Sequence, residues 1–208
     1  MTERHLQVVR IELRELFALA DLLATSLRQQ QAHLKEIMKL PSLIDLQDGP
    51  AEARAERNRR HDKLVRLRLQ EDLRSWALGR AVLDRAHIIS LFFQPSKGAK
   101  SSARKRAADL AQEIPAEVRE VFEDPSMKAV RNDYEHIDER LDDPRPWTVV
   151  GSPLHWRQEA EGKEHTLDLG RILMAMEAIW VAIGDERDYQ VVSSLPSSWL
   201  PQIEEGPA

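Results

Sequence analysis

The first helical stretch is the feature that most limits what this chain can fold into. From Glu3 to Leu40 the sequence predicts one uninterrupted helix, ended by Leu40-Pro41 and followed by the turn signal Asp48-Gly49-Pro50. Its apolar side chains recur at helical spacing, at Leu6, Val9, Leu13, Leu16, Leu19, Ala20, Leu23 and Leu27. A helix of this length needs long helical partners, so it favours an all-α fold.

A second helical stretch of similar length, from about Ala51 to Phe93, supports that prediction. Its first half is highly charged, and Leu64, Val65, Leu67 and Leu69 are expected to restore the apolar face. Its second half, Trp76 to Phe93, is mostly apolar and is predicted to be the core helix. Charged residues make up 31% of the chain and aromatic residues 5%, and this composition also favours helix.

The middle of the chain predicts shorter elements. A loop over Pro95–Ser102 precedes a helix from Ala103 to about Glu113, and another segment runs through Phe122. A further helix is predicted from Ser126 to Leu141, where Asp142-Asp143-Pro144 stops it.

A small β-hairpin insert is predicted next, at about residues 146–167. Trp147–Val150, Leu154–Trp156 and His165–Leu167 have strand-like content, and Glu161-Gly162-Lys163 allows a turn. Asp168 is a suitable N-cap for a last, apolar helix. We therefore predict an all-α antiparallel helical bundle with long N-terminal helices and this insert, as a single domain over 1–192 with a partly ordered tail over 193–208.

Composition and charge exclude several classes of site. The chain has no cysteine, which excludes disulfides and thiolate metal sites and fits a cytoplasmic location. The net charge is -5, so any contact with nucleic acid has to be local. No apolar run is long enough to cross a membrane, and the N-terminus lacks an apolar signal core. No cofactor is expected.

The candidate catalytic residues lie in the string Arg131-Asn132-Asp133-Tyr134-Glu135-His136. On a helix, Asn132 and His136 lie one turn apart with Arg131 beside them, whereas Val130, Tyr134, Ile137 and Leu141 form an apolar stripe on another side. Arginine keeps its positive charge and can donate two hydrogen bonds at once to phosphoryl oxygens. Histidine transfers protons near neutral pH. The three polar residues are therefore a candidate site for phosphate chemistry.

This R-N-x-x-x-H string, in a helical context, resembles the signature of the HEPN superfamily. The longer string Arg131–Asp142, and Arg85–Pro95 upstream, resemble uncharacterised bacterial HEPN-like proteins. The resemblance covers roughly residues 75 to 185. It implies a homodimer in which two such motifs face one cleft and, in active members, metal-independent RNA cleavage. Many members are toxins or defence proteins, so an antitoxin or another regulatory protein is a further expected partner.

The resemblance also implies roles for the three residues. RNA carries its own nucleophile in the 2′-hydroxyl group, so the protein has to supply only proton transfer and charge stabilisation. His136 would be the general acid or base, Arg131 would stabilise the phosphorane, and Asn132 would orient the imidazole or the phosphate.

The charge around this string is unfavourable for RNA. Between Arg131 and Arg145 there are six acidic residues and three arginines, so positive charge has to come from elsewhere. One basic run is the predicted RNA-binding segment, and it comprises Lys97, Lys100, Arg104, Lys105 and Arg106. A second run follows the second helix, at Arg54, Arg57, Arg59, Arg60, Lys63, Arg66 and Arg68.

Other interpretations stay open. Arg131 and Glu135 are an ordinary i,i+4 ion pair by spacing, and basic runs of this kind are more often solvated helix faces than RNA-binding sites. A non-catalytic HEPN-like module that binds RNA, nucleotides or a protein is one alternative. A di-metal carboxylate enzyme is another, because Asp84-x-x-His87 and Asp133-x-x-His136 are carboxylate-x-x-His pairs to which Glu12, Glu15 or Glu36 could be added. We predict no metal site.

Overall fold

The computed structural model describes residues 3–41, 50–95, 98–123, 126, 150–152, 155–160 and 163–184. Within them the chain is predominantly helical, as the sequence predicted. The helices are α1 (Glu3–Met38), α2 (Ala51–Phe93), α3 (Ser101–Glu113), α4 (Ala116–Glu123) and α7 (Leu169–Ile183). The strands are β1 (Val150–Ser152), β2 (His155–Ala160) and β3 (Lys163–Asp168).

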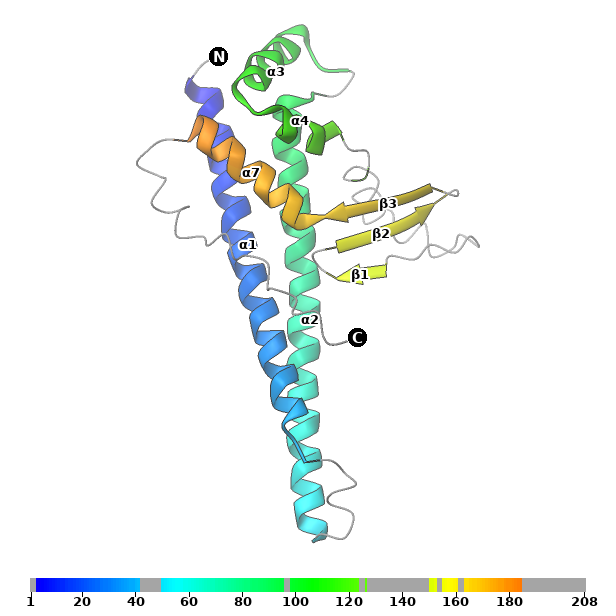
Figure 1. Cartoon of the computed structure of the whole chain (residues 1–208). Coiled ribbons are helices and arrows are strands. Elements are labelled where there is room, and N and C mark those ends of the chain that lie inside the picture. Colours follow the sequence, from blue (N-terminus) through cyan, green and yellow to red (C-terminus); the bar gives the residue numbers. More distant parts are fainter. Residues whose placement is uncertain are drawn as a thin grey trace.

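Helices α1 and α2 run in opposite directions as a long hairpin (Figure 1). Polar side chains mark their register. Glu12 on α1 pairs with Arg85 on α2, and Glu36, near the other end of α1, pairs with Arg60. As the residue number rises along α1, that of its partner falls along α2 at the same rate, so the two helices keep one antiparallel register over most of their length.

Helix α7 lies across the upper part of this hairpin and completes the core (Figure 1). Apolar residues spaced along α7 are buried there, among them Ile172, Met176, Ile179 and Trp180. The Trp180 ring packs edge-on against Phe17, with ring centroids 6.2 Å apart. The indole nitrogen of Trp180 is buried without a hydrogen-bond partner among the described residues, so contacts of the ring rather than a hydrogen bond hold this side chain.

The ends of α7 are fixed by defined contacts. Asp168 accepts hydrogen bonds from the backbone nitrogens of Gly170 (2.8 Å) and Arg171 (3.3 Å), which confirms it as the N-cap. At the other end, Arg10 Nε donates to the carbonyl oxygen of Ile183 at 2.7 Å. That bond satisfies a carbonyl that no later turn of the helix can reach.

Helices α3 and α4 lie at the end of the hairpin where α2 stops (Figure 1). Phe93, the last residue of α2, stacks on Phe122 of α4 with ring centroids 5.6 Å apart. Ala107 and Leu110 are the buried side of α3. These contacts anchor α3 and α4 to the core, so the exposed side chains of α3 project from a helix that is held in place.

The strands form one antiparallel sheet in the order β1-β2-β3. Strands β2 and β3 pair from His155 opposite Asp168 to Ala160 opposite Lys163. Strand β3 leads directly into α7, so the sheet is joined to the core through the N-cap of that helix.

One sequence expectation is wrong. Leu69 was expected on the apolar face of α2, but its side chain is 57% exposed. Leu73, one turn further on, is 73% exposed. The segment is helical, as its apolar spacing predicts, but no described element covers that side of α2. Of the predicted helix 126–141 only Ser126 is described, and the predicted tail 193–208 lies outside the described residues.

Over the described ranges, no helix combines the length and the apolar character that crossing a membrane requires.

Candidate functional site

The three predicted catalytic residues, Arg131, Asn132 and His136, lie outside the residues that the structure describes. They fall between Ser126, which is buried, and Val150, where β1 begins. Their segment is thus joined at one end to α4 on the core and at the other to the sheet. The structure therefore describes only the elements that precede and follow these three residues in the chain, which are α4 and β1.

The predicted RNA-binding segment is largely described. Lys100 is the N-cap of α3, Arg104 and Lys105 are exposed in its first turns, and Arg106 is half-buried; Lys97 lies outside the described residues. The carbonyl of Lys100 accepts from the backbone nitrogens of Ala103 (2.9 Å) and Arg104 (3.2 Å). The structure therefore brings three exposed cations together at one helix end.

This end of α3 is unusually positive for its position. Its first turn contains no acidic residue, and Lys100 makes no side-chain cap. The backbone amides at a helix N-terminus already carry partial positive charge, and acidic residues usually offset it. Here basic side chains add to it, so the arrangement suits an anion such as a phosphate group.

The second basic run lies at the far end of α2, and three of its seven cations make local contacts. Arg59 pairs with Glu56 at 2.6 Å and Arg60 with Glu36 at 3.4 Å. Arg57 Nε donates to the carbonyl of Pro41 at 3.2 Å. These contacts favour the interpretation of this run as a structural and solvated face.

The two basic runs are far apart. Arg59 and Phe93, where α2 ends next to α3, are separated by about 50 Å at 1.5 Å per residue. One monomer therefore cannot use both runs on the same short stretch of RNA, and α3 is the better candidate.

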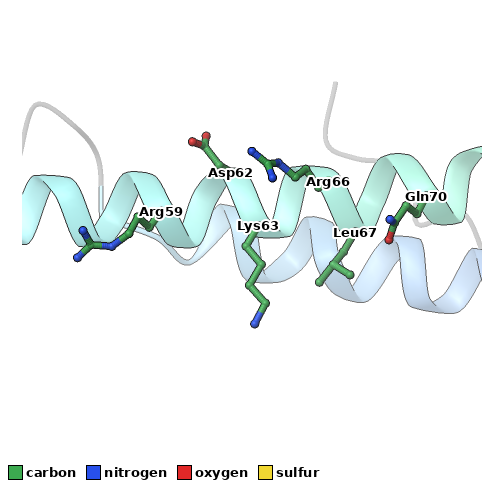
Figure 2. A pocket seen from close by; sticks show the side chains of 6 residues that line it. All are labelled: Arg59, Asp62, Lys63, Arg66, Leu67 and Gln70. Atoms are coloured by element: carbon green, nitrogen blue, oxygen red, sulfur yellow. The ribbon is translucent and has the colours of Figure 1, made fainter.

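A shallow depression of about 380 Å³ lies on the basic half of α2, as Figure 2 shows. It is lined by Arg59, Asp62, Lys63, Arg66, Leu67 and Gln70. All six side chains come from successive turns of one helix, and no pair of them forms a proton-transfer site. The depression is a surface feature with mixed charge rather than a candidate active site.

Arg85, at the start of the segment that resembles HEPN-like proteins, has a structural role. Its guanidinium contacts Glu12 at 2.5 Å and Glu15 at 2.6 Å and so joins α2 to α1. The hydrogen bond to Glu12, which outweighs the cost of burial, raises the pKa of Arg85 above its ordinary value. The sequence offered Glu12 and Glu15 only as possible metal ligands and did not predict this pairing.

That pairing weakens the di-metal alternative. Glu12 and Glu15 face a guanidinium, and Glu36 contacts Lys39 at 2.8 Å as well as Arg60. Among the described residues, no three histidine, aspartate or glutamate side chains gather closely enough to hold a metal ion. Asp133 and His136, which that alternative also needs, are outside this part of the chain.

Searches against protein-family models, curated proteins and solved structures found no match to this chain.

Proposed function

We propose that this chain is a HEPN-like, metal-independent ribonuclease of a toxin or defence system, active on RNA in the cytoplasm. The observation that carries the proposal is the Arg131-Asn132-x-x-x-His136 string, which follows α4 in a predominantly helical chain. In this proposal the whole of residues 1–192 is one antiparallel bundle with a hairpin insert, and it works as a homodimer. An antitoxin or another regulatory protein would control it.

The proposed chemistry uses only side chains and the RNA itself. The 2′-oxygen attacks the adjacent phosphorus and the 5′-oxygen leaves, which yields a cyclic phosphate and a free 5′-hydroxyl group. One His136 accepts the proton of the 2′-hydroxyl, and the His136 of a second subunit protonates the leaving oxygen. Arg131 stabilises the additional negative charge on the phosphoryl oxygens, and Asn132 orients the reacting groups.

The positive end of α3 supports the RNA-binding part of the proposal. Lys100, Arg104 and Lys105 are exposed together at the start of α3, the helix that precedes α4 in the chain. We assign them contacts with the RNA backbone outside the cleavage site, with Lys97 and Arg106 as neighbours. Such contacts hold the strand where the acidic residues around the motif would repel it.

The test is cleavage of a fluorescent single-stranded RNA in the presence of EDTA. His136→Ala and Arg131→Ala should each lower the rate by about two orders of magnitude or more, since each removes a group that acts in the transition state. Arg131→Lys should restore little, because an ammonium group cannot fork onto two oxygens. His33→Ala, which changes a half-buried histidine of α1, is the matched control and should leave the rate unchanged.

Variants of α3 separate binding from chemistry. Neutralising Lys100, Arg104 and Lys105 together should weaken RNA binding and flatten its salt dependence, with the rate at saturating RNA preserved. Equal cleavage by wild-type protein and His136→Ala would reject the catalytic proposal. RNA binding that depends on α3 without any cleavage would replace it with the second candidate, a non-catalytic HEPN-like binding module, which the same positive helix end favours.

A further inference from the structure

Charge is distributed unevenly along the molecule. The distal half of the α1–α2 hairpin, residues 28–41 and 50–74, contains 11 lysines and arginines against six aspartates and glutamates. The rest of the chain contains 19 against 29. A chain with a net charge of -5 therefore has one strongly positive part, and that part extends beyond α7 and the sheet (Figure 1).

One face of α2 in this distal half carries a row of cations. Arg59, Lys63 and Arg66 are exposed, and they follow one another at spacings of four and three residues. Side chains at these spacings are neighbours on one side of a helix. All three line the depression of about 380 Å³ that Figure 2 shows. We call these three residues the α2 cation row.

The α2 cation row is accessible to an anionic partner. Lys63 and Arg66 make no hydrogen bond or ion pair with any residue that the structure describes. Arg59 pairs with Glu56, but the two side chains are 70% and 69% exposed, and an exposed ion pair contributes little stability. A phosphate group can therefore replace the carboxylate of Glu56. The acidic residue that lines the depression is Asp62.

The composition of the distal half indicates the kind of anion. Residues 28–41 and 50–74 contain no phenylalanine, tryptophan or tyrosine. Protein interfaces are enriched in aromatic residues and depleted in lysine, and proteins that hold single strands stack the bases on aromatic rings. A duplex keeps its bases stacked inside and presents phosphates outside. Cations without aromatic neighbours therefore fit the backbone of a duplex best.

We propose that the α2 cation row binds the phosphate backbone of an RNA duplex, so that the substrate is a structured RNA with a stem beside the strand that is cleaved. The choice of RNA over DNA rests on the proposed function, whereas charge and composition point only to a duplex. Arg66 and Phe93, where α2 ends next to α3, are about 40 Å apart at 1.5 Å per residue. The row and the positive end of α3 would thus bind different parts of one RNA.

Binding of a fluorescent RNA duplex of about 20 base pairs tests the row directly. The full chain carries His136→Ala in this measurement, so that cleavage does not interfere. Lys63→Gln/Arg66→Gln should weaken binding about tenfold and lower the slope of its logarithmic salt dependence by about two, because two phosphate contacts are lost. Both side chains are exposed and glutamine favours helix, so circular dichroism should show unchanged helix content.

The matched control removes the same charge elsewhere. Arg4→Gln/Arg171→Gln changes two exposed arginines, on α1 and α7, outside the distal half, and should leave the affinity and the salt slope unchanged. Asp62→Asn should act in the opposite direction and tighten binding about threefold, because it removes a carboxylate that faces the phosphates. An equal loss in the control, or no gain in Asp62→Asn, would overturn the proposal.

Three other anions test the choice of partner. The effect of Lys63→Gln/Arg66→Gln should be about threefold or less with a single-stranded RNA of the same length, since a flexible strand has a lower charge density. Duplex RNA should bind at least as tightly as duplex DNA. An equal loss with the single strand, or tighter binding of DNA, would contradict the proposal. So would vesicles with about 30% phosphatidylserine that lose affinity in the variant while duplex RNA does not.

Cleavage separates this proposal from the proposed function. With a stem–loop RNA, Lys63→Gln/Arg66→Gln should raise KM about tenfold and preserve kcat, because the row binds RNA away from the reacting groups. Wild-type protein that binds the duplex through the row but cleaves nothing would reject the ribonuclease and leave the row supported. Wild-type protein that cleaves RNA, with a variant that binds the duplex as tightly as wild type, would reject the row alone.

Discussion

The two halves of the α1–α2 hairpin are held together in different ways. The core half comprises residues 9–27 of α1 and residues 75–93 of α2, and every buried residue of the two helices lies within these ranges. In the distal half, residues 28–41 and 50–74, none of the described side chains is buried. Its interhelical contacts include polar ones, such as Gln30 to Asp72 at 2.7 Å and Arg60 to Glu36 at 3.4 Å, and its apolar side chains, such as Leu64 and Leu67, are at most half-buried.

The difference shows what a third helix contributes. Two helices alone can shield only a narrow strip between them, whereas α7 closes the upper part of the hairpin into a core with apolar side chains on three sides. The distal half depends on helix propensity and on exposed ion pairs, each of which contributes little. It is therefore the part of the fold with the least local stability.

The largest expected effect comes from removing a core leucine. Leu83 is fully buried in the core half, so Leu83→Ala should lower the free energy of unfolding by about 2–5 kcal/mol. Leu67→Ala, at a half-buried position in the distal half, should lower it by about 1 kcal/mol or less. Urea denaturation followed by circular dichroism measures both. Equal losses would show that the distal half is packed as tightly as the core.

Two glycine substitutions test how tightly the end of α7 is packed, one at that end and one at an open position elsewhere. A Cβ on Gly184 would lie 2.4 Å from the carbonyl oxygen of Trp180 and 3.3 Å from its ring. Gly184→Ala should therefore force the helix end to shift and cost about 1–3 kcal/mol. Gly98→Ala is the control, because nothing lies within 4 Å of its added methyl group, and it should change stability by about 0.5 kcal/mol or less. A Gly184→Ala variant with the wild-type melting temperature would mean that this end of the core is loose.

Ion pairs provide a smaller test. Arg85 bridges Glu12 and Glu15 across the two helices, so Arg85→Ala should cost about 1 kcal/mol, less at high salt. Arg74 lies 3.8 Å from Glu71 on its own helix and is half exposed, so Arg74→Ala should have no measurable effect. Thermal melts at low and high salt distinguish them. An equal effect of the two variants would argue that interhelical and local ion pairs are equivalent here.

The smallest effect concerns pH in the distal half. The hydrogen bond from Lys39, aided by its charge and by that of Arg60, lowers the pKa of Glu36 below its ordinary value of 4.5. A carboxyl group with a lowered pKa stabilises the folded state above its unfolded pKa, and this stabilisation is lost as pH falls through the folded pKa. Protection of residues 31–41 against hydrogen exchange should therefore decline on acidification below about pH 4.5. In Glu36→Gln the decline should be absent, and an unchanged decline would assign it to other groups.

Much of the helical framework could be predicted because its signals are local. Pro41 marks the end of α1, the bounds of α2 coincide with its predicted range, and Asp168 caps α7 through its own side chain. Each of these depends on backbone chemistry within a few residues. The apolar spacing of α1 likewise identified the face of that helix that packs in the core.

The sequence does not show which helix faces are covered by another element of the fold. Periodicity placed Leu69 on an apolar side of α2, but only the arrangement of the helices in space decides that Leu83 is covered and Leu69 is exposed. Arg85 and Glu12 are 73 positions apart in the sequence, and their pairing depends on the register of α1 against α2. The catalytic prediction at Arg131 and His136 remains a prediction from sequence.

The bond from Arg10 to the carbonyl of Ile183 has a consequence for how the chain folds. It joins residues 173 positions apart, whereas α1 and α2 are neighbours along the chain and can pair soon after both exist. Contacts between distant segments form late, because the loop between them has to close first. Docking of α7 is therefore the expected slow step, and until it occurs the apolar side of the α1–α2 pair is open to water and to other chains. The time that this side spends uncovered, rather than the stability of the finished core, should set how readily the protein aggregates while it folds.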